Sequence, residues 1–377
     1  MEFLNETLNY KLLEKWGKHL QDVEDKINTE QKRLIIAGIL ENEERLFRNN
    51  IEMANLPEGI THFTVTNQGI ARALFPIIKK AWKDTILDRI VSVQPIKSTL
   101  AYVRKIDYVY NKTAGDATAG QSVITTRTKQ YSSVNLSSME FNNASTWFDR
   151  DIDVKITRVA VEAGIRVLRA AWDLLSDYIA KLDNEQDLDP AVIEVLANKI
   201  RFEIETAVID DMRTNAVHSE SVSFDNSSPE AKDRSEKEVY HAVLKVAAKI
   251  AKAKYVNPNW LIMNPATSAV FERQEMFSVI YDEAKYISGI GRKLFGVINN
   301  RFLVIIDPQY PDNEILVGWK GPSILEAAYI YAPCVPLIVT DKYFDPRTVS
   351  YSRTLASIDA TYLVDANYFG KVTLSGF

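Results

Sequence analysis

Cysteine is almost absent from this chain and histidine is rare, which excludes several kinds of site. Cys334 is the only cysteine among 377 residues, so an intrachain disulfide and a cysteine-based metal cluster are both excluded. Histidine occurs four times, and no pair has the H-x-x-x-H spacing that places two ligands on one helix face. The four are His19, His62, His218 and His241.

The chain also lacks a strong charge bias and a long apolar run. Its 45 Lys and Arg against 50 Asp and Glu give a net charge of -5, so no basic field favours binding to nucleic acid. No uncharged apolar stretch is long enough to span a bilayer, and the opening MEFLNETLNY has neither region of a secretory signal. We therefore expect a soluble protein that is made in a cytoplasm and has no membrane partner.

Motifs of catalysis are missing as well. We find no phosphate loop of the G-x-x-x-x-G-K-[ST] type and no G-x-S-x-G nucleophile motif. The segment GIGRKLFG at 289–296 lacks the Lys-Ser/Thr end and is interpreted as a turn. Asp151 and Asp153 have the D-x-D spacing of a Mg²⁺ site, but the regular alternation around them favours two solvent-facing carboxylates on a strand. We predict no enzyme activity, no cofactor and no metal.

Two further features have a functional and a structural interpretation. Cys334 lies in the apolar segment APCVP without a histidine nearby in the sequence, which favours an inert buried thiol over a catalytic one. Lys245, Lys249 and Lys252 recur every three or four residues and could contact phosphates, but a solvated helix face is the simpler interpretation.

What the sequence does contain is ordinary globular composition, 46% hydrophobic and 25% charged, with two amphipathic helices predicted within residues 1–48. In the first helix one stripe carries Leu8, Leu12, Trp16, Leu20, Val23 and Ile27. Asn28 and Thr29 interrupt the pattern and can cap the second helix, whose apolar side carries Leu34, Ile35, Ile39, Leu40 and Phe47. Because one apolar stripe cannot be buried alone, this segment needs a partner.

The middle of the chain changes from helix to strand. Pro57 and Gly59 predict a linker between residues 49 and 66, and a helix is expected over 68–92. Residues 100–110, LAYVRKIDYVY, predict a strand, and residues 151–157 alternate with Ile152, Val154 and Ile156 on one face. We interpret 100–170 as one two-stranded excursion, which is marginal in water unless it leans on a neighbour.

The remaining pattern predicts an α+β fold. Asp189-Pro190 is a helix start, and an apolar stripe continues from it to about Met212. A polar loop is expected at 219–236 and a helix at 237–254. Buried strands are predicted at WLIM (260–263), FLVII (302–306) and ILVGW (315–319), and a β-rich tail at 349–374.

Several segments, in order along nearly the whole chain, resemble the major head proteins of T-even-type tailed phages. They are KLLEKWGKHL (11–20), EQKRLIIAGILENEERLF (30–47), IVSVQPIKS (90–98), ITRVAVEAGIRVLRAAWDLLSDYIA (156–180), VGWKGPSILEAAYIYAPCVPLIV (317–339) and FDPRTVSYSRT (344–354). The resemblance implies the Hong Kong 97-like phage capsid fold, in which an N-terminal arm and a hairpin called the E-loop reach neighbouring subunits. It implies a major capsid protein that self-assembles into the icosahedral head shell around a phage genome.

The resemblance also implies a division of the chain. The expected parts are an N-terminal helical assembly segment (1–58), the N-arm and start of the peripheral domain (59–100), the E-loop (101–170), the peripheral domain (171–240) with a spine helix at 189–213, the axial domain (241–345), and C-terminal strands returning to the peripheral domain (346–377). The stretch 111–150 is too short for the extra domain that T-even-type head proteins insert near the E-loop, so the E-loop itself is expected to make the corresponding contacts.

A phage-encoded prohead protease trims relatives of this type after an apolar-x-Glu pattern, which Leu56 and Glu58 match with Gly59 following. We predict cleavage between Glu58 and Gly59 after the segment has guided prohead assembly. Residues 1–58 carry eight Lys and Arg against twelve Asp and Glu, whereas the remainder is nearly neutral at -1. Losing the segment would therefore make the interior of the shell less repulsive to DNA.

The partners implied are other copies in hexamers and pentamers, the scaffold, the protease, the portal and vertex proteins, and enclosed double-stranded DNA bound without sequence specificity. Three alternatives stay open at this point: a pentamer-only vertex paralogue, an encapsulin-like cargo shell, and a soluble α+β enzyme with an unrecognised site.

Overall fold

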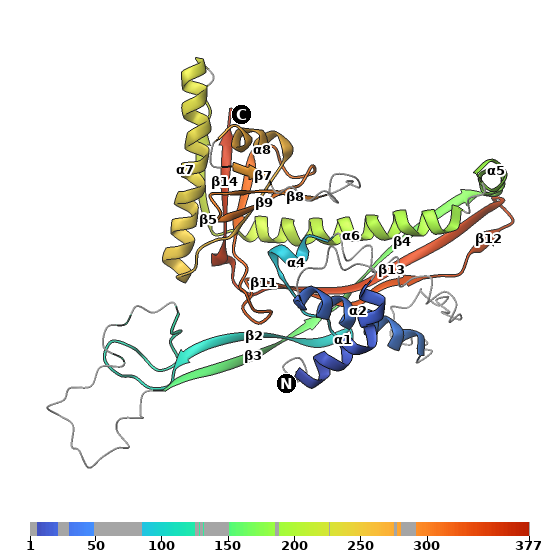
Figure 1. Cartoon of the computed structure of the whole chain (residues 1–377), viewed down its shortest axis with the longest axis horizontal. Helices are drawn as coiled ribbons and strands as arrows, with labels where there is room; N and C mark the ends of the chain where they lie inside the picture. The colour runs from blue at the N-terminus through green and yellow to red at the C-terminus, as the bar shows by residue number, and fades with distance from the viewer. Residues whose placement is uncertain are drawn as a thin grey trace, which may run out of the picture. The chain divides into compact units, whose positions relative to one another are not determined.

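The structure, a computed structural model, describes residues 6–21, 30–48, 85–124, 128, 131, 151–184, 188–225, 227–274, 277–279 and 292–376 (Figure 1). The chain forms two compact units. Unit 1 comprises Met1–Tyr102, Ala160–Asp210 and Ile330–Tyr362, and unit 2 comprises Val103–Val159, Asp211–Tyr329 and Leu363–Phe377. Both helices and sheets are present in each unit, so the predicted α+β class is confirmed.

Unit 1 is built on a five-stranded sheet in the order β1-β11-β13-β12, with β4 also paired to β13. These strands are β1 (Ser92–Val93), β4 (Gly164–Asp173), β11 (Tyr329–Val339), β12 (Tyr343–Asp345) and β13 (Ser350–Leu363). All eleven residues of β11 are buried. β4 and β13 pair antiparallel over ten residues, from Gly164 opposite Asp359 to Asp173 opposite Ser350.

Five helices belong wholly or mainly to unit 1. They are α1 (Glu6–Gln21), α2 (Glu30–Arg48), α4 (Leu87–Ile90), α5 (Leu174–Asn184) and α6 (Leu188–Asn215). α6 confirms the predicted helix at 189–213. Its first turn is bound to β13, because Arg353 Nε donates a hydrogen bond to Asp189 Oδ1 at 2.6 Å. Arg353 Nη1 also donates to the Thr340 carbonyl at 2.6 Å.

Unit 2 contains a seven-stranded sheet in the order β5-β14-β10-β6-β9-β8-β7. The strands are β5 (His218–Ser223), β6 (Trp260–Met263), β7 (Phe277–Val279), β8 (Lys293–Ile298), β9 (Phe302–Ile306), β10 (Glu314–Gly318) and β14 (Phe369–Ser375). Helix α7 (Pro229–Lys254) packs on β5 and β14 through a buried stripe that includes Val243, Val246 and Ile250. A shorter helix, α8 (Pro265–Glu272), and a 3₁₀ turn, η4 (Ala366–Tyr368), complete the unit.

A two-stranded sheet of β2 (Leu100–Tyr110) and β3 (Ile152–Glu162) pairs with no other strand of the described chain. The predicted excursion over 100–170 is therefore wrong at its end. Residues 164–173 form β4, which pairs with β13 in the sheet of unit 1. Alternation in the sequence does not distinguish a strand of a ribbon from a strand of a sheet, since both have a period of two.

Most predicted elements in the described residues are confirmed, and two are wrong in part. α1, α2, β2, β6, β9 and β10 lie where the sequence predicts them. The polar loop expected at 219–236 instead contains β5 and the first two turns of α7. Ser228 caps that helix by accepting a hydrogen bond from the Ala231 amide, and Pro229 follows at the first helical position. Of the helix expected over 68–92, residues 68–84 lie outside the described chain, and the described helix ends at Ile90.

Two strand pairings concern the expected division of the chain. β11, in the range expected for an axial domain, pairs with β13 in unit 1. β14, in the expected C-terminal tail, pairs with β10 and with β5, and β5 lies in the range expected for the peripheral domain. The roles of arm, E-loop, peripheral and axial domain stay predictions.

No helix in the described part of the chain is long and apolar enough to cross a lipid bilayer.

Gly318 is expected to be intolerant of a side chain. It lies opposite Trp260 between β10 and β6, and a Cβ at this position would overlap the indole ring. Gly318→Ala should lower the free energy of unfolding by about 1–3 kcal/mol, as overpacking a close-packed core usually does. Urea denaturation measures this. Gly164→Ala is the matched control, because a Cβ at Gly164 would meet nothing within 4 Å. Equal stabilities of the two variants would contradict the prediction.

Candidate assembly surfaces

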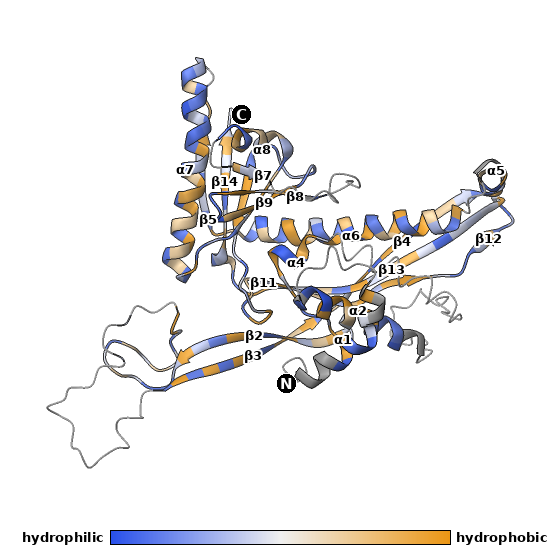
Figure 2. Ribbon diagram, viewed as in Figure 1, coloured by the Kyte–Doolittle hydropathy of each residue, from blue (hydrophilic) through white to orange (hydrophobic). Residues whose placement is uncertain are grey.

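The ribbon of β2 and β3 exposes apolar side chains along its length. On β3, Ile152, Val154 and Ile156 are 51%, 57% and 44% exposed, and on β2, Leu100 and Tyr102 are 71% and 66% exposed. Figure 2 shows hydrophobic and hydrophilic residues alternating along both strands. A ribbon of two strands has no layer to cover either face, so these rows stay in water unless another chain covers them. The alternation at 151–157 predicted this feature.

The end of the ribbon is closed by a small aromatic cluster. Tyr110 and Tyr131 lie with ring centroids 4.3 Å apart, and Ala117 is buried beside them. The Tyr110 hydroxyl and Thr128 Oγ1 are 2.9 Å apart, and the Tyr131 hydroxyl donates to the Asp151 carbonyl at 2.8 Å. The described residues of this connection therefore pack together around the two tyrosines.

A second apolar surface lies on α5. Asp173 caps this helix, because its carboxylate accepts from the Ser176 amide at 2.5 Å and from the Ser176 hydroxyl at 3.0 Å. The exposed apolar residues of α5 are Leu174, Leu175, Tyr178, Ile179 and Leu182. Tyr343 and Phe344 of β12 are exposed as well. The spacing of three and four residues could have predicted this helix from the sequence, but our sequence analysis missed it.

Asp177 fixes α5 to the strands of unit 1. Its Oδ2 accepts from Lys181 at 3.1 Å and from Lys342 at 3.2 Å. The Lys342 ammonium also lies over the ring of Tyr351 at 4.0 Å and over the ring of Trp172 at 5.3 Å. Burial of Asp177 opposes its ionisation, but the hydrogen bonds from the two lysines outweigh burial and hold the pKa of Asp177 below its ordinary value. The apolar row is thus presented on a firmly held helix.

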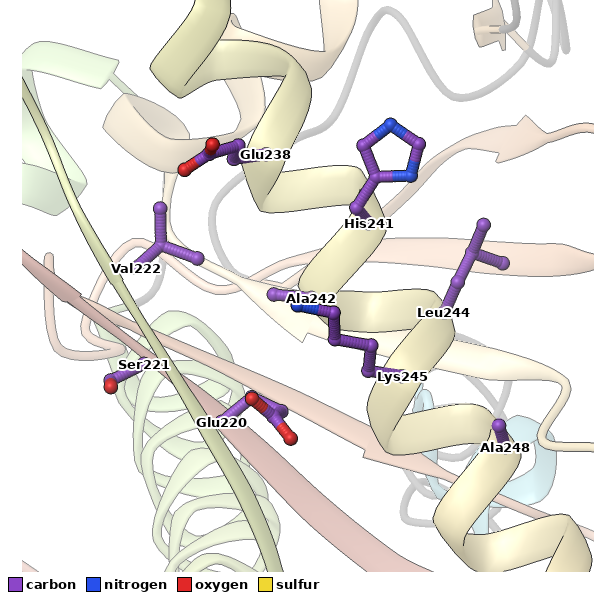
Figure 3. A pocket seen from close by; sticks show the side chains of 9 residues that line it. All are labelled: Glu220, Ser221, Val222, Glu238, His241, Ala242, Leu244, Lys245 and Ala248. Atoms are coloured by element: carbon purple, nitrogen blue, oxygen red, sulfur yellow. The ribbon is translucent and has the colours of Figure 1, made fainter.

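A groove between β5 and α7 has a lining of mixed polar and apolar residues (Figure 3). It is lined by Glu220, Ser221, Val222, Glu238, His241, Ala242, Leu244, Lys245 and Ala248. The His241 ring is turned away from β5. Lys249 donates to Glu220 Oε1 at 2.6 Å and to the Ser219 carbonyl at 2.8 Å, so this cation joins helix to strand. The groove lies where α7 contacts β5. Lys249, one of the three predicted lysines, connects the two elements through its ion pair.

The candidate residues from the sequence do not come together in one site. Asp151 and Asp153 are both exposed, and among the described residues no group of three or more His, Cys, Asp or Glu is placed to hold a metal ion. Cys334 is buried, and burial raises the pKa of its thiol despite the opposing charge of Arg45. The described part of the 289–296 segment begins at Arg292, which pairs with Asp307 at 2.7 Å, and enters β8 rather than a turn. Leu56, Glu58 and Gly59 lie outside the described residues.

One protein-family model matches more than half of this chain. Residues 144–361 match the family model described as major capsid protein Gp23. No curated protein matches the chain.

Similar solved structures were found among virus and virus-like particles. The capsid of Myoviridae phage XM1 is 10% identical with a TM-score of 0.43, and the match covers 75% of this chain and 89% of that chain. The virus-like particle from Pyrococcus furiosus is 10% identical with a TM-score of 0.44, covering 80% of this chain and 96% of that chain. A structure from Mycobacterium phage Adephagia is 11% identical with a TM-score of 0.45, covering 80% of this chain and 90% of that chain.

We predict that Asp177→Asn destabilises unit 1 by about 1–2 kcal/mol at neutral pH, because it removes the charge that Lys181 and Lys342 share. A carboxyl with a lowered pKa stabilises the fold above its ordinary pKa and loses that contribution as the pH falls. The difference between wild type and variant should therefore shrink below about pH 4. Thermal denaturation at several pH values measures it. Asp153→Asn, at an exposed position, should match wild type throughout; a constant difference for Asp177→Asn would refute the charge explanation.

Proposed function

The chain belongs to the Gp23 family of major capsid proteins, and we propose that its subunits join in the phage head shell through the β2–β3 ribbon and the α5 surface. As a member of this family, the chain is a structural protein of the virion that forms the head shell and is not an enzyme. The family match covers the segment from residue 144 to residue 361, which includes β3, β4, α5, α6 and most of β13. The predicted Hong Kong 97-like capsid fold accords with this membership.

The observation that supports the proposed contacts is the exposure of apolar rows on elements that have no covering layer of their own. Burying one large apolar side chain contributes about 1.5–3 kcal/mol. The row of Ile152, Val154 and Ile156 and the row on α5 each offer several such side chains. Many weak contacts of this size suffice in a closed shell, because the contacts of a subunit must break together before it can leave. The same patches meeting repeatedly also lead to closed symmetry.

We predict that Val154→Asp prevents assembly without unfolding the subunit. Val154 is 57% exposed, so the free energy of unfolding of the isolated chain should change by no more than about 0.5 kcal/mol. Placing an unpaired carboxylate in a covered interface costs several kcal/mol, so the yield of closed particles should fall by about tenfold or more. Electron microscopy and sedimentation measure the yield.

The matched control for this test is Lys155→Ser, which changes an exposed residue on the opposite face of the same strand. It should leave particle yield close to wild type. Wild-type yield from Val154→Asp would exclude the ribbon row as a contact, and loss of particles from both variants would show that the strand is generally sensitive.

The finer partners are also part of the proposal. We infer that the N-terminal helical segment guides assembly of a prohead in contact with scaffold, and that the finished shell meets portal and vertex proteins and encloses double-stranded DNA. The near-neutral remainder of the chain supports a lining that tolerates DNA without sequence-specific contacts. A pentamer-only vertex role is the second candidate. The copy number of the chain per particle distinguishes them, since a vertex protein occurs only at the few five-fold positions.

We further propose cleavage between Glu58 and Gly59. The support is the Leu56-x-Glu58-Gly59 pattern in a linker next to a separable helical segment. N-terminal sequencing of subunits from mature particles should begin at Gly59. Glu58→Gln should leave subunits uncut, whereas Glu52→Gln should be cut normally, because the residue two before Glu52 is Asn50 and not apolar. Mature subunits that begin at Met1 would refute cleavage and leave the shell role untouched.

A further inference from the structure

Helix α2 is bound to the edge of the unit 1 sheet through side chains that reach backbone carbonyls. Asn42 Nδ2 donates to the Ile96 carbonyl at 2.9 Å and to the Cys334 carbonyl at 3.2 Å, which joins the segment after β1 to β11. Arg45 Nη2 donates to the Lys97 carbonyl at 2.8 Å. Gly38 of α2 lies close to Pro95, since a Cβ added at Gly38 would be 3.6 Å from Pro95 Cγ, which is ordinary van der Waals contact. One face of α2 is therefore a docking face for this sheet edge.

The docking face contains a carboxyl group in an unfavourable setting. Glu43 is 0% exposed, and neither of its carboxyl oxygens has a hydrogen-bond partner. An isolated carboxylate buried in this way is far more costly than a neutral acid. Burial raises the pKa of Glu43 well above its ordinary value. The backbone amide of Leu337 in β11 lies near the carboxyl group without forming a full hydrogen bond, so it opposes this rise only in part.

The charged groups around the docking face are occupied with other partners. Arg45 is bonded to Lys97 and to Asn42, and Lys32 pairs with Asp88 at 3.2 Å. On the side of α1, Lys15 pairs with Glu41 and Glu44. The titratable side chains of β11 are Tyr329, Tyr331 and Cys334, and burial raises the pKa of Tyr331 and of Cys334. None of these groups contributes to the pKa shift of Glu43.

We propose that α2 is a proton-controlled latch, which stays docked on the β1–β11 edge while Glu43 is neutral and detaches when Glu43 ionises. The latch gives the N-terminal segment a reversible release that precedes any cutting of the chain and does not depend on it. The same ionisation uncovers the edge of β11 for other contacts. The hydrogen bonds of Asn42 and Arg45 fix where α2 docks, and Glu43 sets the pH range over which α2 stays docked.

The direction of the pH effect follows from which state holds the proton. The docked state binds the proton of Glu43 more tightly than the released state, so docking is strongest at low pH. Above the ordinary pKa of glutamate, about 4.3, the docking equilibrium weakens by up to tenfold per pH unit. The weakening ends once the pH exceeds the raised pKa of the docked state.

Cys334 is a built-in reporter of this equilibrium. It is the only cysteine of the chain, it is 6% exposed, and its carbonyl accepts from Asn42 of α2. The experiment measures the rate of maleimide alkylation of the full chain from pH 5 to pH 9. Dividing the wild-type rate by the rate of Glu43→Gln at each pH removes the ordinary pH dependence of the thiolate. The ratio should rise with pH, by up to tenfold per unit, and then level off.

Glu30→Gln is the matched control, since Glu30 is an exposed acid on the same helix. Its rates should follow wild type at every pH. Glu43→Met, of similar size and without charge, is a second reference if Glu43→Gln folds poorly, and it should give the same rising ratio. A ratio independent of pH against both references would overturn the proposal. A pH dependence in wild type that Glu30→Gln abolishes would overturn it as well, because it would assign the effect to a different acid.

Discussion

Backbone pairing along β13 is the interaction on which unit 1 depends. This strand of 14 residues lies between β11 and β12 in the sheet order and also pairs with β4 over ten residues. Its partners come from sequence positions more than 150 residues apart, so the sheet closes only when distant parts of the chain meet. Arg353 of β13 then fixes Asp189 at the start of α6. A single strand thus sets the positions of the long helix, of β4 and, through β4, of α5.

The sequence predicted the elements whose signals are local. Asp189-Pro190 marked the start of α6, and the alternation around Val154 marked both β3 and its exposed row. β11 escaped notice because Pro333 and Pro336 lack the amide hydrogens expected of a central strand. Pro333 still contributes one hydrogen bond, because its carbonyl accepts from the Ile96 amide at 2.9 Å.

The candidate surfaces were only partly predictable for a related reason. The alternation marked the apolar row of β3, but it could not show that β4, which also has a period of two, belongs to the sheet of unit 1. The burial of Glu43 could not be predicted at all. It arises because α2 contacts α1 and also the segment containing Ile96, and only the three-dimensional arrangement shows that an acid on a charged-looking helix reaches neither solvent nor a partner. The family match shows what the chain builds.

The β2–β3 ribbon also has a mechanical consequence. Each strand has 11 residues, which gives the ribbon a length of about 35 Å at 3.3 Å per residue. Turning such a lever by 5° displaces its far end by about 3 Å, roughly the spacing of one residue along a strand. Tyr110 and Tyr131, whose rings are tilted against each other, lie at this end. A small rotation at the base of the ribbon therefore moves its far end by about one residue spacing.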